Sequence, residues 1–289
     1  VGDTYQIESI EFGNWFDTIR GFLPEPAICE LVKPYRSNSK QLQALWDNVR
    51  KMEDDILDRL QAGGYSVNLD PSILTPASEN EIILCLNYDG IYGINNINRF
   101  LQSNNPSNLV TWGINEYKIN DPVLFNESER FAPLIHNNMK GKIVNIEKYE
   151  NEIFFSILLD IKLDEMEAYC HGLEILPNLH NQNSIVRFKV SKHPGSDEDD
   201  NYLDVLVPFQ VTYAVSIHKA QGLEYNSVKI VITNDVEELI THSIFYTAIT
   251  RAREHLKIYW TPETEKAVLN GFSKKNFSKD VGLLKSFRK

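Results

Sequence analysis

The sequence predicts an α/β protein that carries an inserted all-β region. Residues 215–260 follow the order loop, strand, helix and strand, with two apolar runs on either side of a segment whose apolar residues have helical spacing. Residues 81–102 repeat the order strand, loop and helix. From 109 to 211 the pattern changes to short, alternating, β-branched runs between polar turns, which is typical of a small barrel.

Composition and charge set the bounds of the molecule. The 289 residues are 42% hydrophobic and 24% charged, which is enough for about two globular domains. We expect a soluble protein without a membrane segment, because no apolar run could span a bilayer. Cys29, Cys85 and Cys170 form neither a zinc pattern nor a disulfide framework, so a reducing cytoplasm is the simplest location. The net charge of -11 disfavours a nucleic-acid partner only weakly, since acidic residues gather at 147–174 and 197–204 and basic ones at 274–289.

The helices are predicted from spacing and caps. A short helix is expected over 14–23, and a long one after Ser39, with apolar residues stepping by three and four as far as Leu60 and a stop at Gly63. Residues 66–80 form a polar connector. In the helix after the strand at 81–85, four residues are expected to face inward: Ile94, Ile97, Phe100 and Leu101. Within the β-rich region only residues 164–172 fit a helix, and another short helix begins near Pro262.

The last helix of residues 215–260 determines where two arginines point. Its apolar face is expected to extend as far as Ala252, so that face packs on the sheet. At about 100° per residue, Thr247 and Arg251 share one stripe, whereas Arg253 lies roughly 200° away from Arg251. We therefore expect the two arginines to serve different sites. A guanidinium held beside small residues suits a phosphate.

Four motifs carry a resemblance to a known family. HKAQGLEY at 218–225 resembles the fifth motif of superfamily 1 helicases, and FYTAITRAREHLKIYW at 245–260 resembles the sixth. The pattern GDxxQ at 2–6 resembles the third motif, and Tyr35-Arg36-Ser37 resembles the fourth. Because the motifs occur in the family's order and spacing, the chain is similar to the carboxy-terminal half of such a helicase. The strand, loop and helix at 81–102 and the runs NDPVLF and NNMKGKIVNI resemble the RecD-like branch most.

The resemblance implies a domain plan. Residues 1–28 would be a remnant of a first motor domain, and residues 29–108 with 212–270 a second motor domain of the RecA-like (P-loop NTPase) type. Residues 109–211 would be an inserted small SH3-like β-barrel, and residues 271–289 a basic tail. The barrel departs from the family pattern at Lys140, where an acidic residue is more usual, and in its long acidic insertion. A DNA-contacting barrel and a purely structural one therefore remain alternatives.

The resemblance also implies roles at a nucleotide. Arg251 would act as an arginine finger, Arg36 would reach the terminal phosphate, and Gln6 would sense it. Tyr35 would stack on adenine, and Glu224 would bond to the ribose.

Further roles concern single-stranded DNA. Gln221 and Gly222 would couple the nucleotide to the DNA, because one short loop touches both. Backbone contacts to the strand are expected from Ser216, His218, Lys219, Asn87 and Arg99.

Some parts of a helicase are absent from this sequence. There is no GxxxxGK[ST] loop for phosphates, and no paired acids precede Gly2 to hold Mg²⁺. ATP and Mg²⁺ are the expected cofactors, with the Mg²⁺ ligands in a missing amino-terminal part and no metal ligand in this chain. Since the chain starts Val-Gly-Asp, we expect an excised fragment that does not hydrolyse ATP alone.

The intact protein is thus expected to be an ATP-dependent DNA helicase that moves 5′ to 3′ along single-stranded DNA. Its partners would be that DNA, the missing motor domain and possible other replication or repair proteins. One alternative is a non-catalytic nucleic-acid or protein-interaction module, against which the joint retention of Gln6, Arg36, Glu224 and Arg251 argues. The other is an RNA helicase, which only a contact to a 2′-hydroxyl would distinguish.

Overall fold

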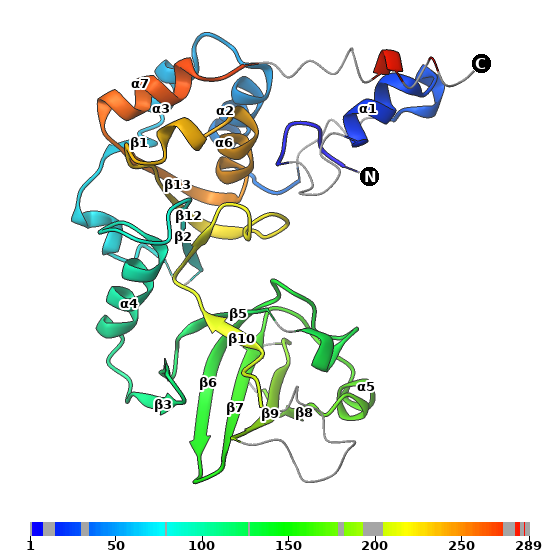
Figure 1. Ribbon diagram of the computed structural model, residues 1–289, viewed down its shortest axis with the longest axis vertical. Coiled ribbons are helices and arrows are strands. Elements are labelled where there is room, and N and C mark those ends of the chain that lie inside the picture. The colour runs from blue at the N-terminus through cyan, green and yellow to red at the C-terminus, as the bar shows by residue number, and fades with distance from the viewer. Residues whose placement is uncertain are drawn as a thin grey trace. The chain divides into compact units, whose positions relative to one another are not determined.

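The computed structural model describes residues 2–7, 15–29, 35–78, 80–126, 128–178, 182–192, 205–273, 281–283 and 286. The chain divides into two compact units, residues 1–94 with 215–289 and residues 95–214 (Figure 1). The acidic stretch at 197–204 and most of the basic tail from 274 lie outside the described residues. In the part of the chain that is described, no helix has the length and apolarity needed to cross a membrane.

The first unit is built on a five-stranded sheet. Its strands stand in the order β1 (Ser66–Asn68), β13 (Ala252–Trp260), β12 (Tyr225–Val231), β2 (Glu81–Cys85) and β11 (Ala214–Ser216). The pairings of β1 with β13, of β13 with β12 and of β12 with β2 are all parallel. Val228, Ile230 and Val231 on β12 are buried on both faces of the strand, which explains the continuous apolar run in its sequence.

The strand β1 is not predicted by the sequence. Residues 66–80 contain this strand and a short 3-10 helix, η2 (Pro71–Leu74), rather than a polar connector alone. Three residues are too few to show an alternating pattern. The strand is instead held by its parallel pairing with residues Ile258 to Trp260 and by the Trp260 indole, which donates to Ser66 Oγ at 2.8 Å.

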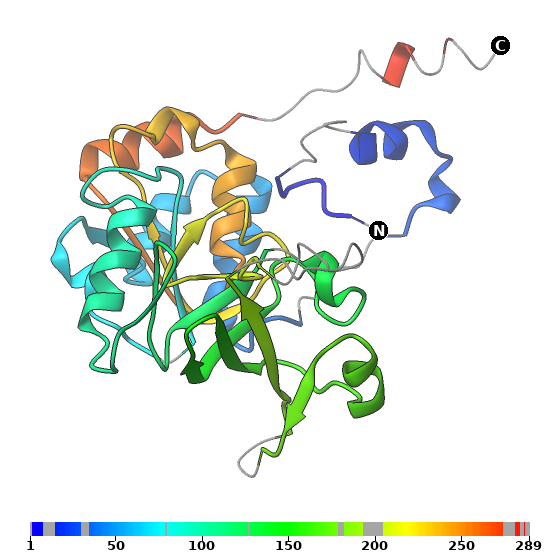
Figure 2. The ribbon, with the colours of Figure 1, turned by 60° about the horizontal axis from the view of Figure 1, so that its bottom comes forward.

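Helices of the first unit are α1 (Trp15–Phe22), α2 (Lys40–Lys51), α3 (Ile56–Ala62), α6 (His242–Ile249) and α7 (Pro262–Asn270), with short 3-10 helices at η1 (Glu25–Ala27) and η5 (Glu237–Leu239). The helices α2 and α6 lie side by side in both views (Figures 1 and 2). Trp46 on α2 donates to the carbonyl of Ile249 at the end of α6 at 3.1 Å. This contact fixes the end of α6 against the middle of α2.

The single helix expected from Ser39 to Gly63 is wrong, because the chain breaks it in two. Ser39 caps α2 as predicted, since its Oγ accepts from the amide of Leu42. Met52, however, is left-handed with φ 55° and ends α2. Asp55 then starts α3, and its carboxylate accepts from Asn48 and Arg59. Acidic side chains between the two helices thus bond locally instead of continuing one helix.

The second unit is β-rich apart from α4 (Ile94–Asn104), α5 (Glu165–Cys170) and the 3-10 helix η3 (Ser128–Phe131). A hairpin joins β3 (Val110–Trp112) to β4 (Asn115–Tyr117). An antiparallel sheet runs in the order β10 (Phe209–Val211), β5 (Pro122–Phe125), β6 (Lys140–Lys148), β7 (Glu152–Leu159), β9 (Ile185–Ser191) and β8 (Glu174–Leu176). The helix expected at 164–172 is confirmed as α5, which Asp164 caps.

One face of this sheet covers an aromatic core. Burial alternates along β9, as expected for a sheet with one buried face. The core rings pack edge to face or tilted, with Phe155 at 5.0 Å from both Tyr117 and Phe209. Gly141 is required where β6 crosses this core, since a Cβ there would lie 2.5 Å from Ile157.

The second unit begins earlier than residue 109, because it takes in most of α4. Asn98 on α4 accepts hydrogen bonds from the amides of Tyr213 and Ala214 at 2.8 and 2.7 Å. The buried Asp121 carboxylate accepts from Gln102 and from the hydroxyl of Tyr213. The prediction that Phe100 faces inward is wrong: its side chain is 46% exposed, because it lies at the edge of the stripe that buries Ile94, Ile97 and Leu101.

Candidate functional site

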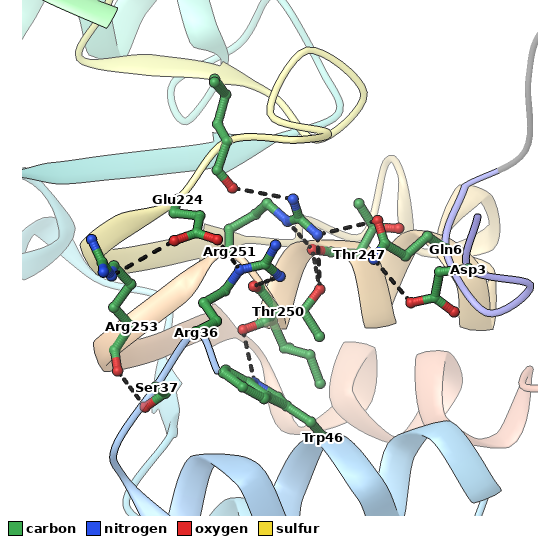
Figure 3. A network of polar contacts seen from close by, with 12 residues as sticks. Asp3, Gln6, Arg36, Ser37, Trp46, Glu224, Thr247, Thr250, Arg251 and Arg253 are labelled. Atoms are coloured by element: carbon green, nitrogen blue, oxygen red, sulfur yellow. Dashed lines mark hydrogen bonds and ion pairs between the residues drawn. The ribbon is translucent and has the colours of Figure 1, made fainter. Parts of the chain in front are cut away.

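Arg251 is buried in the turn between α6 and β13. Its side chain is 0% exposed, and every hydrogen-bond partner found for it is a neutral oxygen (Figure 3). Nε donates to the carbonyl of Thr247 at 2.9 Å and Nη1 to that of Leu223 at 3.1 Å. Nη2 donates to Thr250 Oγ1 at 3.1 Å and to Gln6 Oε1 at 3.2 Å.

The surroundings of Arg251 destabilise the protonated, positively charged form of its guanidinium. Burial lowers the pKa of Arg251 to about 10, and the positive charge of Arg36 lowers the pKa in the same direction, while Glu224 and Asp3 oppose that change. Arg251 is therefore still cationic at neutral pH. Within the described residues it forms no ion pair. A buried cation with only neutral partners is costly unless an anion can approach it, so this arrangement suits anion binding.

Arg36 lies against the same turn. Its Nη1 donates to the carbonyl of Thr250 at 2.7 Å, so the backbone of Thr250 holds Arg36 while its hydroxyl holds Arg251. Arg36 Nε also lies 2.8 Å from Glu224 Oε1. Next to it, the Ser37 hydroxyl donates to the carbonyl of Arg253, which anchors this segment to β13. The structure thus brings together two of the predicted phosphate-binding residues and the predicted ribose-binding residue (Figure 3).

The helical projection that separated Arg251 from Arg253 is wrong in its premise. It assumed one continuous helix, whereas α6 ends at Ile249 and β13 begins at Ala252. Arg253 Nε lies 3.7 Å from Glu224 Oε2, so Glu224 joins Arg253 to Arg36 beside the turn that holds Arg251. Arg253 differs in its exposure: half of its side chain is accessible, whereas Arg251 is enclosed.

The first residues of the chain contact both motifs of the site. Gln6 accepts from Arg251 and donates through Nε2 to Asp3 Oδ2 at 2.9 Å. The amide of Ile7 donates to Thr247 Oγ1 at 2.9 Å, and Gln221 donates to the carbonyl of Ile7 at 3.0 Å. The segment at 2–7 therefore connects α6 with the loop that follows β11. Tyr35 stands next to Arg36 and is 83% exposed, as a ring must be if it is to stack on a base.

Three of the residues predicted to contact a strand of nucleic acid, His218, Lys219 and Asn87, lie in two neighbouring loops, which follow β11 and β2. The amide of Ile217 donates to the carbonyl of Cys85 at 3.1 Å, so β2 and β11 end at the same edge of the sheet. His218 and Gln221 are exposed there, as is Gly222, whose φ of 86° favours glycine. Ser216 is buried, and its hydroxyl accepts from the amide of Lys219 at 3.2 Å.

Two of these predicted contacts differ from the rest. Asn87 uses its amide inside the loop after β2, where Nδ2 donates to the carbonyl of Asp89 at 3.0 Å. Arg99 is exposed on α4, in the second unit.

Thr247, Thr250 and Asp3 are site residues that sequence reasoning did not single out as functional. Each of the three lies within four residues of Arg251 or Gln6 in the same motif, and this proximity could have indicated that they belong to the site. A separate cavity of about 990 Å³ is lined by Tyr5, Arg50 and His242 among others, and none of the predicted nucleotide-binding residues lines it. Among the described residues no group of three His, Cys, Asp or Glu is arranged for a metal.

A known protein family matches the part of the chain that contains Glu224 and Arg251. Residues 212–259 match the model of the UvrD-like helicase C-terminal domain. The RecBCD enzyme subunit RecD of Buchnera aphidicola subsp. Schizaphis graminum is 27% identical over 194 residues, which are 64% of this chain and 25% of that protein. The corresponding subunit of the Acyrthosiphon pisum subspecies is 23% identical over 185 residues, 63% of this chain and 25% of that protein. The chain spans about a quarter of the length of these curated relatives.

Among solved structures, the Pif1 helicase from Candida albicans has a TM-score of 0.57 at 14% identity, covering 99% of this chain and 67% of that one. At this identity the likeness shows the fold alone, and it confirms the predicted α/β class. The match at residues 212–259 and the RecD relatives confirm the resemblance of this chain to the carboxy-terminal half of a superfamily 1 helicase.

Proposed function

We propose that this chain is the carboxy-terminal part of an ATP-dependent DNA helicase. The observation that carries the proposal is the buried Arg251 guanidinium, which has only neutral partners and shares Thr250 with Arg36. Its sequence relatives are subunits of RecBCD enzymes, and its structural relative is a Pif1 helicase. ATP is the anion that this family would bring to such a pair of cations.

The proposed chemistry is stabilisation of a leaving phosphoryl group. Negative charge spreads over the transferred phosphate in the transition state, and fixed cations stabilise it. Arg251 acts as the finger and Arg36 as a second cation, while Gln6 senses the terminal phosphate through the amide that now contacts Arg251. Tyr35 stacks on adenine, and Glu224 bonds to the ribose. The phosphate loop and the Mg²⁺ ligands would come from a first motor domain.

The proposed DNA contacts lie at the edge where β2 and β11 end. Ser216, His218 and Lys219 would face the backbone of the strand, with Asn87 and Arg99 as further candidates. Coupling to ATP would run through Gln221, because the loop that exposes His218 also contacts the carbonyl of Ile7 near Gln6. Gly222 allows the tight turn in this loop.

The domain plan belongs to the same proposal. Residues 1–28 are a remnant of the first motor domain, residues 29–108 and 212–270 form the second, and 271–289 form a basic tail. Residues 109–211 form an SH3-like barrel, for which the antiparallel sheet and its aromatic core are the support. Movement 5′ to 3′ is proposed from the resemblance of the β-rich region to the barrel of the RecD-like branch, and a cytoplasmic location from the cysteine pattern. Contacts with other replication or repair proteins are part of the same proposal.

ATP turnover by the full-length protein that contains this chain tests the proposal, measured with and without single-stranded DNA. Arg36→Ala and Arg251→Lys should each lower DNA-stimulated turnover, the latter by ~10³ if Arg251 is the finger. Arg59→Ala is the matched control, because Arg59 lies on α3 in an exposed pair with Asp55. Circular dichroism establishes that the variants are folded. Turnover by Arg251→Lys equal to wild type contradicts the finger role.

A non-catalytic interaction module is the second candidate. It requires that the full-length wild type show no turnover while it still binds a nucleic acid or a protein. An RNA helicase would show turnover stimulated by RNA and not by DNA of the same sequence, since only a contact to the 2′-hydroxyl distinguishes the two.

A further inference from the structure

The loop between β2 and α4 is closed on itself by backbone hydrogen bonds. The amide of Ile94 donates to the carbonyl of Asn87 at 3.1 Å, and the amide of Gly93 donates to that of Gly90 at 3.1 Å. Gly90 has φ 93°, and a Cβ at Gly93 would lie 2.3 Å from the carbonyl oxygen of Asp89. Two glycines are thus required to make the loop this tight, and its shape is set by the backbone rather than by a partner.

This compact loop presents apolar side chains outward. Ile91 is 80% exposed and Tyr88 is 49% exposed, whereas Asn87 uses its amide to hold the loop. Single exposed apolar residues are common. Two large ones on one loop of eight residues expose apolar surface to water, which is unfavourable unless a partner covers it. The loop has no Lys or Arg, and its charged residue is the exposed Asp89. The exposed side chains of Tyr88 and Ile91 therefore offer no positive charge to phosphate oxygens.

The position of the loop relates it to the proposed DNA contacts. Cys85 ends β2, and its carbonyl accepts from Ile217, the residue between Ser216 and His218. The two loops therefore start from the same point of the sheet edge, one with polar and basic side chains and the other with apolar ones. Single-stranded nucleic acid offers both surfaces that this pair requires, namely a phosphate backbone and unstacked bases.

We propose that Tyr88 and Ile91 form a platform on which unstacked bases of a single nucleic-acid strand pack, while the loop of His218 follows the backbone. This inference rests on the proposed function and deepens it, since it assigns base contacts where the motifs imply only backbone contacts. The Tyr88 ring stacks on a base face, and Ile91 packs against the neighbouring base. Such packing accepts any base, because every base has a flat apolar face.

The test compares two strands on this chain. Fluorescence anisotropy is measured with a labelled oligothymidylate of about 16 nucleotides and with a strand of equal length whose sugars lack bases. Wild type should bind the base-containing strand more tightly. Tyr88→Ala should weaken that binding about tenfold and leave binding to the abasic strand unchanged, since stacking contributes roughly 1–3 kcal/mol per base. Ile91→Ala should act in the same direction, and Tyr88→Phe should bind like wild type because it keeps the ring.

Two exposed residues elsewhere provide matched controls. Tyr169→Ala on α5 and Leu239→Ala on η5 remove side chains that are 82% and 58% exposed and should change neither affinity. Thermal unfolding establishes that Tyr88→Ala is folded.

Several outcomes overturn the inference. It is overturned if wild type binds both strands equally, if Tyr88→Ala loses as much affinity for the abasic strand, or if Tyr88→Phe is as weak as Tyr88→Ala. In each of those cases the proposed nucleic-acid binding still stands. If wild type binds neither strand, the nucleic-acid part of the proposed function fails, and this inference fails with it.

Discussion

Cys85 couples the stability of the sheet to alkaline pH. Complete burial raises the pKa of its thiol to about 12, whereas a thiol in an unfolded chain titrates near about 8.5. Between these values the unfolded state loses the proton that the folded state keeps. The free energy of unfolding is therefore unaffected below about pH 8.5 and falls above it, by up to ~1.4 kcal/mol per pH unit. Urea unfolding between about pH 8 and 11 measures this decline.

The control for this prediction is Cys85→Ala, which removes the thiol. The free energy of unfolding of this variant should decline only above about pH 10, where tyrosines of unfolded chains titrate. Tyr246 and Tyr117 cause this later decline, because burial raises the pKa of each in the folded state to about 12. Parallel pH curves for wild type and variant would show that Cys85 does not cause the early decline. The exposed Cys29 and Cys170 should react quickly with a thiol reagent in the folded protein, and Cys85 slowly.

At the scale of single residues, the motifs predicted which side chains lie in the site but not the hydrogen bonds that join them. The sequence identified Gln6, Arg36, Glu224 and Arg251, and the structure brings all four into one network. It could not show that Thr250 joins the two arginines, because that depends on where α6 ends. The helical projection placed Arg253 elsewhere for the same reason, since two residues of turn change every direction after Ile249.

At the scale of elements, a buried ion pair joins strands β12 and β2. The apolar run in the sequence of β12 gives no sign of it. Lys229 Nζ lies 2.9 Å from Glu81 Oε1 on β2, with side chains 5% and 10% exposed, and also donates to the carbonyl of Ile73 at 3.1 Å. It therefore ties η2 to the sheet. Lys229→Met alone should destabilise the fold by about 3–5 kcal/mol, because it leaves the Glu81 carboxylate buried without its partner.

A double-mutant cycle measures this pair by urea unfolding. Combining Lys229→Met with Glu81→Leu should cost less than the sum of the single changes by roughly 1–3 kcal/mol, since no charge is then left alone. The exposed pair of Lys51 and Asp47 on α2, 2.6 Å apart, is the control, and its coupling should be only ~0.3–0.5 kcal/mol. Equal couplings for the two pairs would show that burial does not strengthen the contact between Lys229 and Glu81.

Elements with a long pattern were predictable, and those fixed by local bonds or by distant pairing were not. The spacing of apolar residues located α2, α3 and α6, and alternation located the strands of the second unit. The break at Met52 depends on side-chain bonds of Asp55, and β1 depends on residues almost two hundred positions away. Neither leaves a periodic signal in the sequence.

At the scale of the whole molecule, the net charge of -11 limits how a nucleic acid can be held. Each phosphate that a basic residue neutralises releases counterions, so binding weakens as the salt concentration rises. For a single strand, a plot of log binding constant against log salt concentration has a slope of about -0.7 per phosphate contact. The proposed contacts from His218 and Lys219 would neutralise few phosphates, and the net negative charge of the chain would repel the strand. We therefore expect a shallow slope of about -1.5 to -2 for oligothymidylate binding by this chain, with base packing supplying much of the affinity.

Anisotropy titrations over a series of salt concentrations measure that slope. Lys219→Gln should make it shallower by about 0.7, since one phosphate contact is lost, whereas Tyr88→Ala should lower the affinity at every salt concentration by the same factor. Lys51→Gln, on the exposed surface of α2, provides the matched loss of charge outside the proposed contacts and should leave the slope unchanged. A wild-type slope steeper than about -3.5 would require five or more phosphate contacts. Binding would then depend on basic residues other than those of the loop after β11, and base packing would be a minor contribution.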